Sequence, residues 1–334
     1  MTRFTVSEAL VAALSEFELI DRFFRRPARH AVLGIGDDAA LLAPTPGCEL
    51  AVSVDMLVAG RHFFADVDPE ALGHKTLAVN LSDMAAMGAS PRWALLAGAL
   101  PDADAAWIGA FARGFFALAD AYGVDLVGGD TTKGPLNLCV TILGEAPAGQ
   151  ALRRRGARPG DTVLVSGRLG DAALALAHHR RRVILTPDEL AQCEPALLRP
   201  TPRVELGARL RGIATAAIDI SDGLVGDLGH VLEASGVGAT LELPALPRSA
   251  ALDRRLAGDE RNLALDCLLA GGDDYELCFT APAGAAAEIS ALAEQLGLAL
   301  TRIGSIEERA GLEVRDECGR SLKTLPAPFE HFRS

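Results

Sequence analysis

Aspartates in short segments that also carry Gly or Ser are the residues of this chain best suited to chemistry. Seven of them stand in five segments, at residues 34–38, 52–55, 80–83, 128–132 and 218–222. Most of these segments follow an apolar run, so we expect each carboxylate to lie where a buried strand or helix opens into a loop. Carboxylates gathered at such points are the usual setting for a hard cation.

The residue types favour magnesium among the possible cations. Two carboxylates about 4 Å apart repel by roughly 4 kcal/mol at an effective dielectric constant near 20, so a group of them needs a cation or protonation. Oxygen ligands without a His or Cys cluster favour Mg²⁺ or Mn²⁺ over zinc or copper. Calcium is the weaker interpretation because the EF-hand spacing is missing. Since Mg²⁺ usually bridges one or two carboxylates to phosphates, the pattern anticipates a nucleoside triphosphate.

A Gly-rich stretch at residues 128–135 (GGDTTKGP) supports a phosphate ligand. Its backbone N–H groups could approach an anion while Asp130 meets the metal. The Walker A loop, the protein-kinase Gly-rich loop and the G-x-G-x-x-G fingerprint are all missing from the sequence. Phosphoryl transfer depends mainly on positioning and charge neutralisation, so metals with Lys or Arg could suffice.

Each candidate also has a purely structural interpretation. Asp222 or Ser221 could cap a following helix, and Asp37 could form a turn. The segment 271–277 (GGDDYEL) could be a tight turn that enters a strand, and His62 could be an ordinary loop histidine. Lys75 and Arg154 could each be either surface charges or phosphate contacts.

Composition excludes several classes of function. The net charge of −12 and pI near 5.1 argue against a nucleic-acid partner, which would need a basic stripe. The six cysteines are scattered without a C-x-x-C pair, which disfavours a zinc site or disulfide framework and favours a reducing cytoplasm. The N-terminus lacks the features of a signal peptide, and no run reaches the roughly eighteen apolar residues of a membrane span.

The pattern of apolar residues predicts alternating helices and strands in two domains. A chain of 334 residues with 49% hydrophobic content exceeds one typical core. The Gly, Pro and Arg residues of 147–159 mark the boundary, so we predict domains at 1–148 and 149–334. Helices are expected at 6–24, 71–87, 104–122, 170–179, 203–211, 224–235 and 285–296, and strands at 49–54, 93–100, 124–127, 136–144, 162–166, 214–220, 276–280, 300–306 and 312–314. This alternation indicates an α/β or α+β protein without fixing the topology.

Six segments taken in order resemble the thiamine-monophosphate kinase family over nearly the whole chain. They are residues 34–40 (GIGDDAA), 55–63 (DMLVAGRHF), 75–89 (KTLAVNLSDMAAMGA), 128–135 (GGDTTKGP), 218–224 (IDISDGL) and 271–279 (GGDDYELCF). That family is related to aminoimidazole ribonucleotide synthetase and selenophosphate synthetase, which use ATP without a Walker loop. The resemblance implies a two-domain α/β (α+β) fold of the aminoimidazole ribonucleotide synthetase type. It also implies a homodimer whose N-terminal strands pair across the two-fold axis.

The resemblance further implies a reaction and a set of site residues. ATP and thiamine monophosphate would give ADP and thiamine diphosphate by direct transfer of the γ-phosphoryl group, with several Mg²⁺ ions per site and no phosphoenzyme. The implied magnesium ligands are Asp38, Ser53, Val54 through its backbone carbonyl, Asp55, Asp83, Asp130, Asp219 and Asp222. The implied ATP contacts are Gly129, Asp130, Arg154 and Ser221, and the implied substrate contacts are His62, Asp273 and Phe329.

Three positions depart from the family pattern. Asp273 stands where Glu is common, Phe329 where Trp is frequent, and Lys133 where Arg is common. The shorter Asp273 side chain keeps the charge but retreats by one methylene, and Phe329 keeps ring stacking without the indole donor. Two alternatives stay open, namely another ATP-using member of the superfamily and a non-catalytic sensor of nucleotides or divalent ions. A selenophosphate synthetase usually needs a Cys near its N-terminus, and the first Cys here is Cys48.

Overall fold

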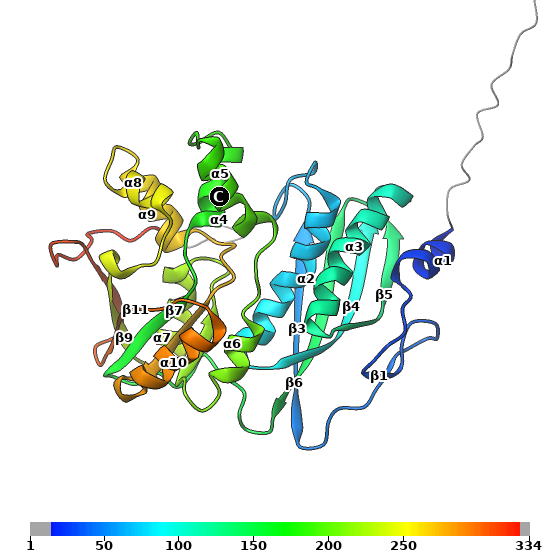
Figure 1. The fold of residues 1–334 in the computed structure, drawn as a ribbon, viewed down its shortest axis with the longest axis horizontal. Helices are drawn as coiled ribbons and strands as arrows, with labels where there is room; N and C mark the ends of the chain where they lie inside the picture. Colours follow the sequence, from blue (N-terminus) through cyan, green and yellow to red (C-terminus); the bar gives the residue numbers. More distant parts are fainter. Residues whose placement is uncertain (1–14, 328–334) are drawn as a thin grey trace, which may run out of the picture.

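Two large β-sheets, one from each half of the chain, organise the molecule (Figure 1). The structure is a computed structural model that describes residues 15–327. The first large sheet has the strand order β3-β6-β4-β5, with β3 at Cys48–Val58, β4 at Ser90–Leu100, β5 at Asp125–Lys133 and β6 at Asn137–Pro147. Strands β4 and β5 are parallel and the other pairs are antiparallel. The pair β1 (Ala31–Leu33) and β2 (Leu41–Leu42) forms a separate small sheet.

Two long helices, α2 (Pro69–Ala86) and α3 (Ala105–Tyr122), lie side by side along the four-stranded sheet (Figure 1). Asp68 and Asp104 cap their N-termini by accepting backbone N–H groups. The two backbones approach closely at glycines. A Cβ on Gly73 would lie 2.0 Å from the Phe111 carbonyl oxygen, and one on Gly114 would lie 1.8 Å from that of Glu70. Any side chain at either position would therefore force the helices apart.

Strand β3 has one covered face and one open face. Ser53, Asp55 and Leu57 alternate with the exposed residues and are more buried, because they lie on the side of α2. The opposite face carries four exposed apolar side chains, Leu50, Val52, Val54 and Met56, and Val52 and Val54 are 60% and 59% exposed. Because β3 is also an edge strand among residues 15–327, the sheet offers both an open apolar face and an edge that no other described strand covers.

The second large sheet has six strands in the order β12-β9-β11-β7-β10-β8. All of its neighbours are antiparallel except β9 and β12. Its strands are β7 (Asp161–Ser166), β8 (Ala216–Asp219), β9 (Gly238–Glu242), β10 (Leu277–Pro282), β11 (Leu300–Glu307) and β12 (Gly311–Arg315). The helices of this half are α4 (Asp171–His179), α5 (Pro187–Leu198), α6 (Val204–Arg209), α7 (Leu224–Ser235), α8 (Ala250–Leu256), α9 (Arg261–Ala270) and α10 (Ala286–Leu296).

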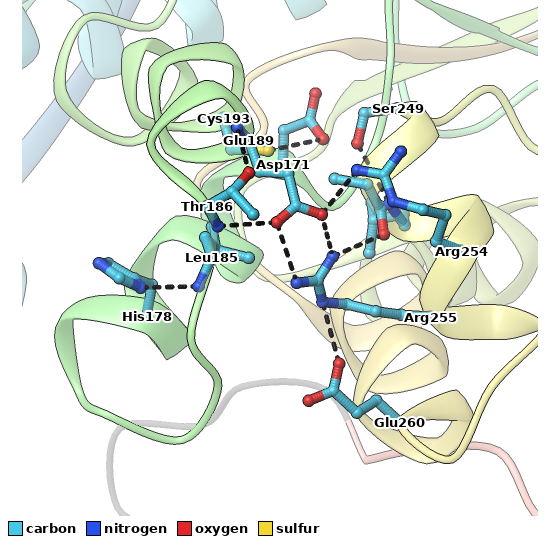
Figure 2. Close-up of polar contacts among 12 residues, drawn as sticks. Asp171, His178, Leu185, Thr186, Glu189, Cys193, Ser249, Arg254, Arg255 and Glu260 are labelled. Atoms are coloured by element: carbon cyan, nitrogen blue, oxygen red, sulfur yellow. Dashed lines mark hydrogen bonds and ion pairs between the residues drawn. The ribbon is translucent and has the colours of Figure 1, made fainter.

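A polar network ties α5 to α8 beside the six-stranded sheet (Figure 2). The Glu189 carboxylate accepts hydrogen bonds of 2.7 Å from both Arg254 and Arg255. The hydrogen bond from Arg255 is the main cause of the strongly lowered pKa of Glu189. The neighbouring Cys193 thiol lies 3.5 Å from the Asp171 carboxylate at the start of α4. These contacts fix α4, whose far end lines the candidate site.

Helix α2 lies between the two halves of the chain and joins their cores. It contacts β3 and β6 on one side and β8 and α6 on the other. Fourteen of its 18 residues are buried, which explains why its sequence shows little amphipathic pattern. Residues such as Leu77 belong to one continuous apolar cluster with Leu277 and Phe279 of the six-stranded sheet. The division of the chain at 148 and 149 stays a prediction.

Several expected elements differ from the structure. The segment 128–133 was expected to be a loop, but it continues β5 because it pairs with Leu95–Leu100 of β4. Of the helix expected at 6–24, residues 6–14 lie outside the described residues. The rest forms α1 (Glu16–Leu19) and a π-helical turn (Ile20–Phe24). Helices α5, α8 and α9 and strands β1, β2 and β9 were not predicted. Within residues 15–327, each helix is too short or too polar to cross a bilayer.

Candidate active site

Four of the predicted metal ligands come together where α2 meets both sheets. Asp55 lies on β3, Asp83 on α2, Asp219 at the end of β8, and Asp222 in the loop that follows. Burial and, to a smaller extent, the charges of Asp83, Asp219 and Asp222 together raise the pKa of Asp55 to about 7. The structure therefore gathers carboxylates from segments more than 160 residues apart into one electrostatic cluster.

Two hydroxyl groups hold the inner carboxylates of this cluster. The Ser53 hydroxyl donates to Asp83, and the Ser82 hydroxyl donates to Asp219 at 2.7 Å. The pKa of Asp83 is raised by burial, although the Ser53 hydrogen bond and the positive charge of Arg154 oppose the shift. The pKa of Asp219 is also raised, mainly by burial and then by Asp83. Neighbouring carboxyl groups repel each other when both are ionised, and a bound cation would relieve this repulsion.

The loop that carries Ser221 and Asp222 is held by an aspartate that sequence reasoning missed. Asp227, in the first turns of α7, accepts backbone N–H groups from Ser221 at 3.0 Å and from Asp222 and Gly223 at 3.1 Å. Burial raises its pKa to about 7. The expectation that Ser221 or Asp222 caps α7 was wrong, because the N-cap is Gly223, which has no side chain, and Asp227 binds the free N–H groups instead. The only signal in the sequence is an Asp six residues after Ser221.

Asp38 and Asp130 line a different cleft from Asp55 and Asp222. This second cleft has a volume of about 900 Å³ and runs over the ends of β4 and β5, with Gly129 in its wall. The strand register places Asp55 opposite Val140, Val140 opposite Leu96, and Leu96 opposite Gly129. Three strand spacings amount to about 14 Å. A single chain therefore does not bring all the predicted ligands into one pocket.

Gly129 shows why this segment is glycine-rich. Its φ of +150° lies in the region that favours glycine, and a Cβ there would lie 1.8 Å from the Leu96 carbonyl oxygen. The neighbouring strand thus packs directly against the backbone before Asp130. Val54 lies in the β3–β6 ladder opposite Thr141, and its side chain is on the exposed face.

The cleft beside the acid cluster has a volume of about 870 Å³ and extends to the predicted substrate contacts. Asp55, Ser221 and Asp222 line this cleft, and so do His62 and Asp273. The Nδ1 atom of His62 accepts the Val58 N–H at 3.0 Å, which leaves the Nε2 atom as the donor of a neutral ring. Phe329 lies outside the described residues, but Pro326 and Ala327 line this same cleft.

Asp273 is held by contacts from both halves of the chain. Its carboxylate lies 3.1 Å from the Lys75 ammonium and accepts a 3.1 Å hydrogen bond from the Tyr275 hydroxyl. Its backbone N–H donates to the Ser221 carbonyl at 2.9 Å. Lys75 is only 3% exposed, so it is not a surface charge. Arg154 is exposed and close enough to Asp83 to affect its pKa.

Comparison with known proteins identifies the family. Residues 36–146 match the model for the N-terminal domain of AIR synthase related proteins, and residues 158–317 match the model for the C-terminal domain. The thiamine-monophosphate kinase of Salmonella typhimurium is 47% identical over 298 residues, covering 88% of this chain and 91% of that protein. The chain belongs to the thiamine-monophosphate kinase family.

Solved structures of the thiamine-monophosphate kinase family agree with this assignment. The Stenotrophomonas maltophilia K279a enzyme has a TM-score of 0.82 and 50% identity, covering 90% of this chain and 96% of that one. A structure of AaThiL complexed with AMPPCP and TMP has a TM-score of 0.74 and 33% identity, covering 95% and 97%. The hydrogenase maturation protein HypE of E. coli, at 24% identity and a TM-score of 0.76, shares the fold alone.

Proposed function

We propose that the protein transfers the γ-phosphoryl group of ATP to thiamine monophosphate, which yields ADP and thiamine diphosphate. A phosphate oxygen of thiamine monophosphate attacks the γ-phosphorus, and the bond from that phosphorus to the oxygen bridging it to the β-phosphate breaks. The observation that carries the proposal is one cleft lined both by Asp55 and Asp222 of the acid cluster and by His62 and Asp273, in a chain of this family. Binding of both substrates without turnover would instead favour the non-catalytic sensor.

Magnesium fits the donor set of the acid cluster. We propose that Asp55, Asp83, Asp219 and Asp222 hold Mg²⁺, with oxygens from Ser53 and the Val54 carbonyl. Among residues 15–327 no three His, Cys, Asp or Glu side chains form a ready-made cage for an ion. Mg²⁺ seldom uses such a cage, because phosphate and water oxygens usually complete its octahedron. When bound, the metal would neutralise the phosphate charge, while Asp227 keeps Ser221 and Asp222 in place.

The remaining family positions divide between the nucleotide and its acceptor. We propose that Gly129, Asp130, Arg154 and Ser221 contact ATP and that Asp38 and Asp130 complete the magnesium ligands. His62, Asp273 and Phe329 are proposed to face thiamine monophosphate. Direct transfer needs no covalent intermediate, since orientation and charge neutralisation lower the barrier.

A homodimer would complete this arrangement. We propose that the apolar face of β3, formed by Leu50, Val52, Val54 and Met56, packs against the same sheet of a second copy. The cleft of Asp38 and Asp130 opens over the same sheet and includes Cys139 and Thr141 of β6. A second copy seated there would lie near both clefts, so the groups that one chain separates could act together across the interface. We further propose a cytoplasmic location, which suits an ATP-consuming enzyme with unpaired cysteines.

The direct test is turnover by the purified protein. The protein is incubated with ATP, Mg²⁺ and thiamine monophosphate, and chromatography measures ADP and thiamine diphosphate in equal amounts. Excess EDTA should abolish the reaction, and Asp55→Asn should do the same. The matched control is Asp259→Asn, which changes an exposed aspartate outside both clefts and should retain activity. Absence of thiamine diphosphate with saturating substrates would refute the proposal.

A further inference from the structure

Lys75 is a buried cation that forms an ion pair with a proposed substrate contact. Only three of the 32 Lys and Arg residues of this chain are lysines, and Lys75 is the one buried in α2. Its ammonium lies 3.1 Å from Asp273 Oδ2. Burying an ammonium group is costly unless an opposite charge compensates it, so the pair is a structural unit.

The Asp273 side chain is fixed from both sides. Lys75 contacts Oδ2, and the Tyr275 hydroxyl donates to Oδ1. The backbone has φ of +70° at Asp273 and +49° at Tyr275, a region that residues with side chains seldom adopt. Tertiary contacts must therefore impose this loop shape. Lys75 is the contact that comes from the first half of the chain, almost 200 residues away.

The position of Lys75 on α2 relates it to the acid cluster. Val79 and Asp83 follow at four and eight residues, so the three lie along one side of the helix. At 1.5 Å per residue, Lys75 lies about 12 Å along the helix axis from Asp83. Val79 lines the large cleft, and Lys75 lines a smaller cavity that shares Arg61, His62 and Asp273 with it. One rigid helix thus sets the distance between the acids and Asp273.

We infer that Lys75 is a positioning residue that orients the Asp273 carboxylate toward the pyrimidine amino group of thiamine monophosphate. This inference rests on the proposed function and assigns Asp273 a specific partner. Each carboxylate oxygen keeps a free lone pair after its contact with Lys75 or Tyr275, and the exocyclic N–H can donate to it. Because Lys75 cancels the charge of Asp273, recognition depends on a directed hydrogen bond rather than on general attraction to the cationic thiazolium ring.

The test measures ligand binding and kinetics in Lys75→Met, Lys75→Arg and Asp273→Asn. Lys75→Met should weaken thiamine monophosphate binding, measured by calorimetry without ATP, by about tenfold or more, while ATP binding changes less than about twofold. The double variant Lys75→Met with Asp273→Asn should bind no more weakly than the worse single variant, since both act through one carboxylate. Lys323→Met, on an exposed lysine, is the matched control and should bind as the wild type does.

A second readout separates positioning from general loss of structure. Wild type should prefer thiamine monophosphate over its analogue with oxygen in place of the pyrimidine amino group by at least about tenfold. Lys75→Met and Asp273→Asn should both lose most of this preference. If Lys75→Met does not fold, Lys75→Arg replaces it, because a guanidinium keeps the charge but cannot reproduce the ammonium geometry.

The outcomes distinguish this inference from the proposed function. If the wild type binds thiamine monophosphate but produces no thiamine diphosphate, the kinase activity is refuted. The role of Lys75 is then still tested by the binding measurements on its variants. Equal losses of ATP and thiamine monophosphate binding, additive effects in the double variant, or an unchanged preference over the analogue would overturn the inference. Wild type that binds no thiamine monophosphate would overturn both.

Discussion

Replacing Asp55 by Asn should stabilise the metal-free protein at neutral and alkaline pH. Asp55 lies in the acid cluster, where burial and the charges of Asp83, Asp219 and Asp222 raise its pKa from 3.8 to about 7. The folded state therefore opposes ionisation of this group. Asn keeps nearly the same shape but carries no charge, so the substitution removes the repulsion and leaves the packing in place.

The sign and size of the effect follow from the pKa shift. A carboxyl group whose pKa is higher in the folded state contributes stability that is complete below pH 3.8 and is lost as the pH rises through about 7. At about 1.4 kcal/mol per pKa unit, the shift corresponds to at most about 4 kcal/mol. Between pH 5 and pH 8 the wild type should lose about 2 to 3 kcal/mol of unfolding free energy from this group.

Urea unfolding in EDTA at pH 5, 6, 7 and 8 measures this loss. The wild type should become less stable over this range. Asp55→Asn should lose less stability, because the Asp55 contribution is removed while Asp219 and Asp227 keep theirs, and it should exceed wild-type stability at pH 8. Adding Mg²⁺ at pH 8 should stabilise the wild type more than the variant, because ion binding favours the folded state. Asp259→Asn should follow the wild type. Wild-type stability that is constant or rises from pH 5 to pH 8, or an Asp55→Asn protein less stable than wild type at pH 8, would refute the reasoning.

Three further predictions use the fold and the loop supports. In thermal unfolding, Gly114→Ala should destabilise the protein by about 1 to 3 kcal/mol, because α2 and α3 must separate. The control Gly229→Ala lies in open space within α7 and should be neutral or stabilising by up to about 1 kcal/mol. Val52→Glu should convert the proposed dimer to monomers in sedimentation experiments, and Ile184→Glu, at an exposed residue away from the sheet, should not. Asp227→Ala should raise the KM for ATP by about tenfold, since it frees three N–H groups of the loop proposed to contact ATP. An unchanged KM would contradict its supporting role.

The sequence predicted elements better than it predicted contacts. The helices and strands around Asp83 and Asp219 were expected close to their observed positions, because apolar periodicity reports local burial. The extension of β5 through Asp130 was not expected, since Gly and Thr residues there indicate a loop unless a neighbouring strand is known. Pairing with β4 overrides the local preference, and pairing is a long-range property.

The same limit explains the residues that sequence reasoning misjudged. Lys75 was equally compatible with a surface charge, because its ion pair joins it to Asp273 in the other half of the chain. Asp227 was missed because a buried aspartate that accepts three backbone N–H groups has the same local sequence as any helix aspartate. Likewise, no local pattern separates Asp130 from Asp55. The family resemblance supplied the set of residues, and the tertiary structure divides that set between two clefts.

Helix α2 explains why the proposed chemistry lies between the two halves of the chain. It is buried on nearly all sides, so it cannot shift without disturbing both sheets. It carries Lys75, which holds the Asp273 carboxylate proposed to meet the pyrimidine, and it carries Asp83, which is proposed to bind magnesium. One rigid helix therefore positions both sites. The glycine contacts at Gly73 and Gly114 should then matter for the proposed function as well as for stability, since a helix displaced from α3 would move Lys75 and Asp83 together. The distance between Lys75 and Asp83 would be preserved, whereas their alignment with the segment of Asp219 and Asp222 would not.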